Sequence, residues 1–135
     1  MGYTHYWKFK KSPAEIADGK QKFANAVALF KEGLKKLSHI PLGNGLGSGE
    51  PVITDTEVCF NGKTPDDYET CFMDLNSKGF GFCKTARQPY DPVVCLLLLC
   101  MANQFEEDEF EYSSDGDIEH GEEGWSIAKD IFDEI

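Results

Sequence analysis

The chain has 135 residues, of which 41% are hydrophobic and 13% aromatic, and this composition predicts one folded domain with an ordinary core rather than a disordered chain. The formal net charge is −11, and it is unevenly spread, because residues 1–40 carry a net +5 and residues 105–135 a net −12. A field of this sign argues against direct binding of nucleic acid. The longest apolar run, residues 93–102, is too short to cross a bilayer, and the N-terminus lacks the apolar core of a secretory signal, so we expect a cytoplasmic protein.

The first third of the chain predicts a strand, a long helix and a loop. Residues 2–10 are rich in aromatic residues and alternate in polarity, as a half-buried strand does. Ser12-Pro13-Ala14-Glu15 has the residues of a capping box, with proline at the first helical position, and apolar residues then recur at helical spacing to about Ser38. The glycines and prolines of residues 41–51 predict a flexible connector.

The rest of the chain predicts several short strands and two more helices. Strands are expected at 57–60, 68–75, 79–85 and 110–113, with a further short one compatible with 52–54. Asn61-Gly62 predicts a turn. Asp91-Pro92 predicts a helix to Gln104, with Asp91 as its N-cap, that is apolar all round and therefore central. A final helix is expected from about Gly121 to Ile135. The order β-α-β-β-β-α-β-α indicates a single α+β domain, residues 1–135, with a mainly antiparallel sheet.

The cysteines and histidines do not indicate a metal site. The five cysteines include no Cys-x-x-Cys pair, and the three histidines are scattered along the chain. Zinc sites typically have closely spaced pairs of ligands. We therefore expect reduced, mostly buried thiols and predict neither a bound metal nor another cofactor.

Arg87 is the only arginine, against twelve lysines, and it lies in the segment Phe-Cys-Lys-Thr-Ala-Arg-Gln-Pro-Tyr-Asp at 82–91. The planar guanidinium matches a phosphate or a carboxylate better than a lysine does. Arg87 and Lys84 could hold a phosphate beside the free N–H groups at the start of the following helix. The alternative is structural, an ion pair of Arg87 with Asp91 or Glu69 that fixes the loop.

Other polar and aromatic side chains at the ends of predicted elements complete the candidate ligand site. They are Thr85, Tyr90, Asp91, His5, Tyr6, Trp7, Asn61, Glu69 and Asp115. Tyr6 or Trp7 could stack a nucleobase, while Asn61, Glu69 and Asp115 would supply polar contacts. His5 could be a general base oriented by Glu69 or Asp115, although a histidine among aromatic residues in a strand is more often packed in the core.

Five motifs extend over nearly the whole chain. They are Met-Gly-Tyr-Thr-His-Tyr-Trp at 1–7, Cys-Phe-Asn-Gly at 59–62, Glu-Thr-Cys-Phe at 69–72, the ten-residue segment at 82–91 and Ser-Ser-Asp-Gly-Asp at 113–117. Together they resemble a family of small, largely uncharacterised proteins encoded by bacteriophages and bacterial genomes. Gln88 stands where the family pattern has lysine, and the glycine-rich residues 43–49 look like an insertion. The resemblance implies no activity, but it implies a phage or prophage origin and a role against host defence or in host takeover.

Three functional hypotheses follow. The first is a non-enzymatic binding domain for a small anionic ligand, such as a nucleotide or a nucleotide-derived signal. The second is an acidic interaction module, in which residues 105–135 contact a basic host protein or mimic nucleic acid, although the same residues could instead dock against the lysine-rich helix of their own chain. The third is a small hydrolase that uses His5.

Overall fold

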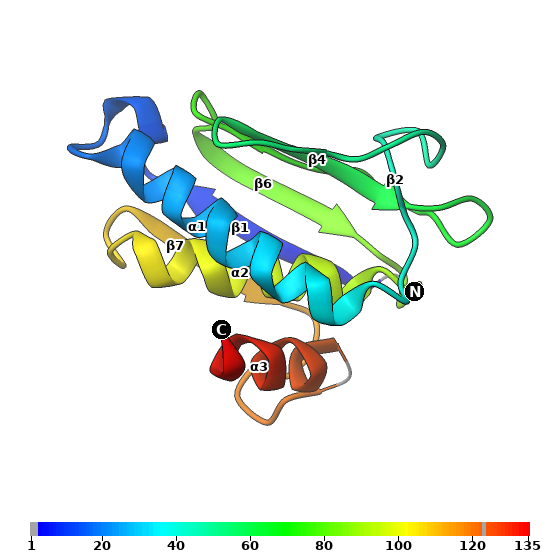
Figure 1. The fold of residues 1–135 in the computed structure, drawn as a ribbon. Helices are drawn as coiled ribbons and strands as arrows, with labels where there is room; N and C mark the ends of the chain where they lie inside the picture. The colour runs from blue at the N-terminus through cyan, green and yellow to red at the C-terminus, as the bar shows by residue number, and fades with distance from the viewer. Residues whose placement is uncertain (1–2, 123) are drawn as a thin grey trace.

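The computed structural model describes residues 3–122 and 124–135, and within these residues three α-helices and seven strands form one compact domain (Figure 1). Its class is α+β, as predicted. The helices are α1 (Gly19–Leu34), α2 (Asp91–Gln104) and α3 (Gly124–Glu134), with short 3-10 helices η1 (Pro13–Glu15) and η2 (Lys35–Leu37) on either side of α1. The strands are β1 (Thr4–Phe9), β2 (Leu42–Gly43), β3 (Val52–Ile53), β4 (Glu57–Gly62), β5 (Cys71–Asp74), β6 (Gly79–Lys84) and β7 (Phe110–Ser114).

All strand pairs are antiparallel and belong to two sheets. One sheet has the order β6-β1-β7, and in the other β4 lies between β2 and β3 and also pairs with β5. The predicted order placed three strands between the first two long helices, whereas the structure has five. β2 was missed because Leu42–Gly43 lies in the glycine-rich segment. Asn61-Gly62 is not a turn, because both residues belong to β4 and pair with β2.

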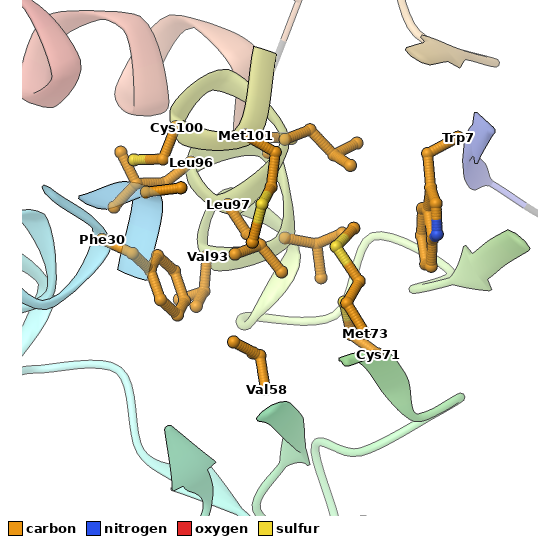
Figure 2. Close-up of a cluster of buried hydrophobic side chains, with 14 of the residues drawn as sticks. Trp7, Phe30, Val58, Cys71, Met73, Val93, Leu96, Leu97, Cys100 and Met101 are labelled. Carbon is orange, nitrogen blue, oxygen red and sulfur yellow. The ribbon is translucent and has the colours of Figure 1, made fainter. Parts of the chain in front are cut away.

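The helix α2 is the centre of the core. It is buried along nearly its whole length, as its apolar sequence predicted, and it packs between α1 and α3 and against β1 and β7 (Figure 1). Figure 2 shows Leu97 of α2 in one cluster with Phe30 of α1 and Met73 of β5. Gly33 permits the close approach of α1, since a Cβ atom there would lie 2.6 Å from a methyl group of Leu96. Among the described residues, no helix is both long and apolar enough to span a bilayer.

The predicted helix from Ser12 is wrong over its first turns. Ser12 and Glu15 do form the capping box, but η1 ends at once, and Asp18 adopts the left-handed conformation with φ 60°. The backbone N–H of Ala14 donates to the carbonyl of Leu75 at 2.9 Å, which docks η1 on the turn after β5. The cap residues therefore start a docked 3-10 turn, and α1 begins only at Gly19. At the other end of the chain, a helix was predicted from about Gly121, but Gly121 and Glu122 lie in a turn before α3.

Among the described residues, two ion pairs connect the lysine-rich helix region to the acidic residues 105–135. The Lys22 Nζ lies 2.8 Å from the Glu109 carboxylate, and the Lys36 Nζ lies 2.9 Å from the Glu134 carboxylate. Part of the negative charge of residues 105–135 is therefore paired with lysines of the same chain. This agrees with the alternative in which these residues dock against the lysine-rich helix. Glu106, Glu107 and Asp108 remain exposed in the turn before β7.

Candidate functional site

The segment between β6 and α2 has an unusual backbone. Ala86 and Arg87 are consecutive non-glycine residues in the left-handed region, with φ of 51° and 60°. The backbone N–H groups of Thr85 and Ala86 both donate to the carbonyl of Tyr3, at 3.0 and 3.2 Å, and hold the turn in this shape. Such conformations cost free energy and cluster at binding and catalytic sites. The backbone conformation therefore indicates a functional site in the same segment in which the only arginine lies.

This turn places Arg87 over the ring of Tyr3, with the guanidinium carbon 4.1 Å from the ring centroid. A guanidinium over an aromatic face is an attractive cation–π pair. Burial, and then the charge of Asp91, raises the pKa of Tyr3 to about 12, so the ring stays neutral at physiological pH. The arginine is therefore held by packing as well as by charge.

Among the residues that the structure describes, Arg87 forms an ion pair with Glu122, at 3.7 Å, and their side chains are 49% and 39% exposed. The two partners considered from the sequence are bound elsewhere. The carboxylate of Asp91 faces His5 and Thr85, and that of Glu69 accepts the backbone N–H of Lys84 at 2.8 Å. Exposed ion pairs of this kind contribute little, about 0–1 kcal/mol.

A surface hollow of about 420 Å³ lies beside Arg87, and we call it the Arg87 hollow. It forms where the segment after η2 meets the beginnings of α2 and α3, which lie at the same end of the molecule in Figure 1. Its lining residues are His39, Ile40, Arg87, Gln88, Pro89, Asp91, Pro92, Gly124 and Ile127. The volume is that of an ordinary small-molecule site, and a mostly apolar wall with a few polar groups is typical of such sites.

Behind the hollow lies a buried hydrogen-bond network. The Nε2 atom of His5 is 2.6 Å from the Asp91 carboxylate, and the Nδ1 atom is 2.8 Å from the hydroxyl oxygen of Ser114. That oxygen already accepts the indole N–H of Trp125 and the backbone N–H of Gly116, at 3.1 and 2.9 Å. A hydroxyl has two acceptor positions and one proton, so Ser114 must donate to Nδ1. His5 therefore carries its proton on Nε2 and donates it to Asp91.

The carboxylate of Asp91 is the centre of this network. It accepts the hydroxyl of Thr85 as well as the N–H of His5, and it belongs to the first turn of α2, whose free N–H groups stabilise an anion. The sequence predicted Asp91 as the N-cap. In the structure Tyr90 is the N-cap, and Asp91 is the first helical residue with its side chain turned inward. Asp91 thus ties β1 and β6 to the start of α2.

The order serine, histidine, aspartate resembles a hydrolase triad, but this arrangement does not provide a nucleophile. His5 is completely buried, and the Ser114 oxygen already accepts two N–H groups. The predicted orienting residues are also wrong. Asp91 orients His5, whereas Asp115 accepts the Tyr6 hydroxyl and the Thr4 backbone N–H. We therefore regard the network as structural.

Among the described residues, one cluster of side chains of the kinds that bind metal ions was found, and it belongs to this network. His5, Asp91 and Cys95 each bring a ligand atom, and all these atoms lie within 4.8 Å of one another. Burial, and then the charge of Asp91, raises the pKa of the Cys95 thiol, which opposes the thiolate that binds metals. The positive end of α2 also opposes a cation. The three residues are better suited to hydrogen bonding than to metal binding. As predicted, the cysteines are free thiols, and all but Cys59 are buried.

A second group of candidate residues fixes the chain between β4 and β6. The Tyr90 hydroxyl donates to the Glu69 carbonyl at 2.6 Å, and burial raises the pKa of Tyr90. The Asn61 amide accepts the N–H of Tyr68 at 2.9 Å and donates to its carbonyl at 3.0 Å. The Lys84 ammonium lies 6.0 Å from the centroid of the Tyr68 ring. None of these residues lines the Arg87 hollow.

The remaining candidates lie on or behind the open face of the β6-β1-β7 sheet. Tyr6 stacks on Phe80, with ring centroids 5.9 Å apart, and Phe80 and Phe82 are 66% and 53% exposed. Trp7 is buried on the opposite face. Sequence reasoning did not select Phe80 or Phe82, although their alternation with Gly79 and Gly81 was visible.

Comparisons with models of known protein families, with curated proteins and with solved structures gave no match. The function must therefore be argued from the geometry of this chain.

Proposed function

We propose that the protein is a non-enzymatic binding domain for a small anionic ligand with a flat or apolar part, such as a nucleotide-like compound, and that the ligand binds in the Arg87 hollow. The observation that carries the proposal is the position of Arg87. It is the only arginine, it stands on a strained left-handed turn, and it lies at a mostly apolar hollow of suitable size.

The lining of the hollow matches the two parts of such a ligand. Arg87 and His39 are the basic side chains, and a phosphate or a carboxylate would bind there through the arginine fork. Ile40, Pro92 and Ile127 provide apolar surface for a ring, and Ile127 is 46% exposed. In this proposal the ring contacts these residues and not Tyr6 or Trp7, which do not line the hollow.

The ion pair with Glu122 does not prevent this binding. An exposed pair at 3.7 Å is weak, whereas a bidentate bond from the guanidinium to a phosphate is short and charge-assisted. The Glu122 carboxylate instead disfavours ligands of high negative charge, because it would lie close to the bound anion and repel it. We therefore expect a ligand with one or two negative charges.

On the resemblance of the five motifs to phage and bacterial proteins, we further propose that the ligand is a compound of the bacterial cell. A nucleotide-derived signal belongs to this class. The binding geometry at Arg87 does not depend on this origin.

The test compares three forms of the protein purified in the same way, namely the wild type, Arg87→Ala and Lys11→Ala. Lys11 is exposed and does not line the hollow, so it controls for the loss of one positive charge. The proteins are denatured, and the released small molecules are identified by mass spectrometry. We expect one anionic compound from the wild type and from Lys11→Ala, and none from Arg87→Ala. The same compound in equal amount from Arg87→Ala would contradict the proposal.

A further inference from the structure

The strand β7 is one of the two edge strands of the β6-β1-β7 sheet and pairs with β1 on one side. The backbone N–H of Asp115 donates to the backbone carbonyl of Thr4 at 2.9 Å, and the backbone N–H of Lys10 donates to the backbone carbonyl of Glu109 at 3.0 Å. In an antiparallel pair such bonded positions alternate, so the N–H and C=O groups of Tyr112 point away from β1. The outward N–H of Phe110 already donates to the carbonyl of Glu106 at 2.9 Å, so the outward groups of Tyr112 are the template for one more strand.

A hollow of about 680 Å³ lies along this edge. Its lining residues are Lys10, Ala102, Phe105, Glu107, Asp108, Phe110, Glu111 and Tyr112. Glu111 and Tyr112 are consecutive strand residues, and their side chains project from opposite faces of the sheet. A hollow lined by both therefore lies over the edge of the strand and not over one face.

The charge of this edge is strongly negative. Glu107, Asp108 and Glu111 are exposed carboxylates around the hollow, and one lysine, Lys10, opposes them. The Lys10 ammonium lies 3.9 Å from Glu111, with both side chains exposed, so this pair neutralises little of the field. The floor is aromatic, from Phe105, Phe110 and Tyr112. Aromatic floors with charged rims are common in protein interfaces.

We propose that the outer edge of β7 binds an extended basic segment of a partner protein, which adds to the β6-β1-β7 sheet as a fourth strand. Its backbone would pair with Tyr112, and its lysine or arginine side chains would contact Glu107, Asp108 and Glu111. A second copy of this chain fits less well, because edge-to-edge pairing would bring two sets of carboxylates together. The site is independent of the Arg87 hollow, since no residue lines both.

The first test uses two synthetic peptides of equal length and charge, added to the full chain. One alternates lysine with valine and can form a strand. The other alternates lysine with proline, so every second residue lacks a backbone N–H and the proline rings disfavour pairing in a sheet. We expect the valine peptide to bind, to slow hydrogen exchange of the Tyr112 amide, and to bind more weakly as salt is added. Equal binding of the proline peptide, or no binding of the valine peptide at millimolar concentration, would overturn the proposal.

The second test reverses charge at the edge without touching the backbone. Glu107→Lys combined with Glu111→Lys should weaken binding of the valine peptide by about tenfold or more, which corresponds to 1.4 kcal/mol or more. The control is Glu119→Lys combined with Asp133→Lys, which makes the same change in net charge at exposed positions outside the hollow. An equal loss in both double variants would show that only the overall charge matters and would overturn the proposal. Self-association of the free chain through β7, detected as a dimer by sedimentation, would also overturn the proposal.

Discussion

Replacing Asp91 with alanine tests whether the buried network holds the fold together. The change removes the acceptor of the His5 Nε2–H and of the Thr85 hydroxyl, both of which are buried. A buried donor left without a partner costs about 1–3 kcal/mol, and the change leaves two such donors, the His5 N–H and the Thr85 hydroxyl. We therefore expect Asp91→Ala to lower the free energy of unfolding by about 3–5 kcal/mol, a large part of the roughly 5–15 kcal/mol of a typical domain.

Urea unfolding, followed by tryptophan fluorescence, measures this loss. With a slope of about 2 kcal/mol per molar urea, the midpoint should fall by about 2 M. Asp91→Asn keeps an acceptor oxygen of the same shape but loses the charge, so about half of the loss is expected. Ser113→Ala, at an exposed position of β7, is the control and should stay within about 0.5 kcal/mol of the wild type. A loss below about 1 kcal/mol for Asp91→Ala would refute the reasoning.

Three further predictions concern stability. The first concerns Glu109, whose contact with Lys22, and then with the N–H of Glu106, holds its pKa below the ordinary value of 4.5. The ionised carboxylate therefore stabilises the fold above pH 4.5, and this stabilisation is lost as the pH falls through the lowered pKa. In urea unfolding, Glu109→Gln should therefore cost up to about 1 kcal/mol at pH 7, and this cost should disappear as the pH falls through the lowered pKa of Glu109. A difference that does not depend on pH would contradict this account. Gly124→Ala would place a Cβ atom 2.2 Å from the Asp91 carboxylate and should lower the melting temperature, at a cost of about 1–3 kcal/mol, whereas an unchanged value would mean that α3 does not close over Asp91. Leu97→Ala in the centre of α2 should cost about 2–5 kcal/mol by urea unfolding, and a small loss would place the core elsewhere.

The elements with strong local signals were predictable from the sequence. α2 could be placed because Asp91-Pro92 marks a helix start before an apolar run, and β1 and β7 because their residues alternate. The break before α1 was not predictable from the capping box alone. It depends on the docking of η1 on Leu75, a contact made by tertiary structure. The two-residue strand β2 exists only because β4 is beside it.

The candidate site was predictable in part. Arg87 was selected because the chain uses lysine elsewhere, and the structure adds the left-handed turn and the hollow beside it. The contact between His5 and Asp91 joins residues 86 positions apart, which a single sequence does not reveal. The spacing of Asp91 and Cys95 by four residues was visible as one face of a helix. His39 and Ile127 carry no local signal, because the packing of α1, α2 and α3 brings them to Arg87.

The central claim is that the Arg87 hollow binds an anion attached to a ring, and a titration followed by backbone amide resonances tests it most directly. The probes are adenosine 5′-monophosphate and adenosine, which share the ring and differ in the phosphate. We predict saturable shifts of Ile40, Gln88 and Ile127, affinity at least about tenfold weaker for adenosine, and loss of this difference in Arg87→Ala. Equal affinity for the two probes, shifts confined to other residues, or a difference that persists in Arg87→Ala would contradict the account.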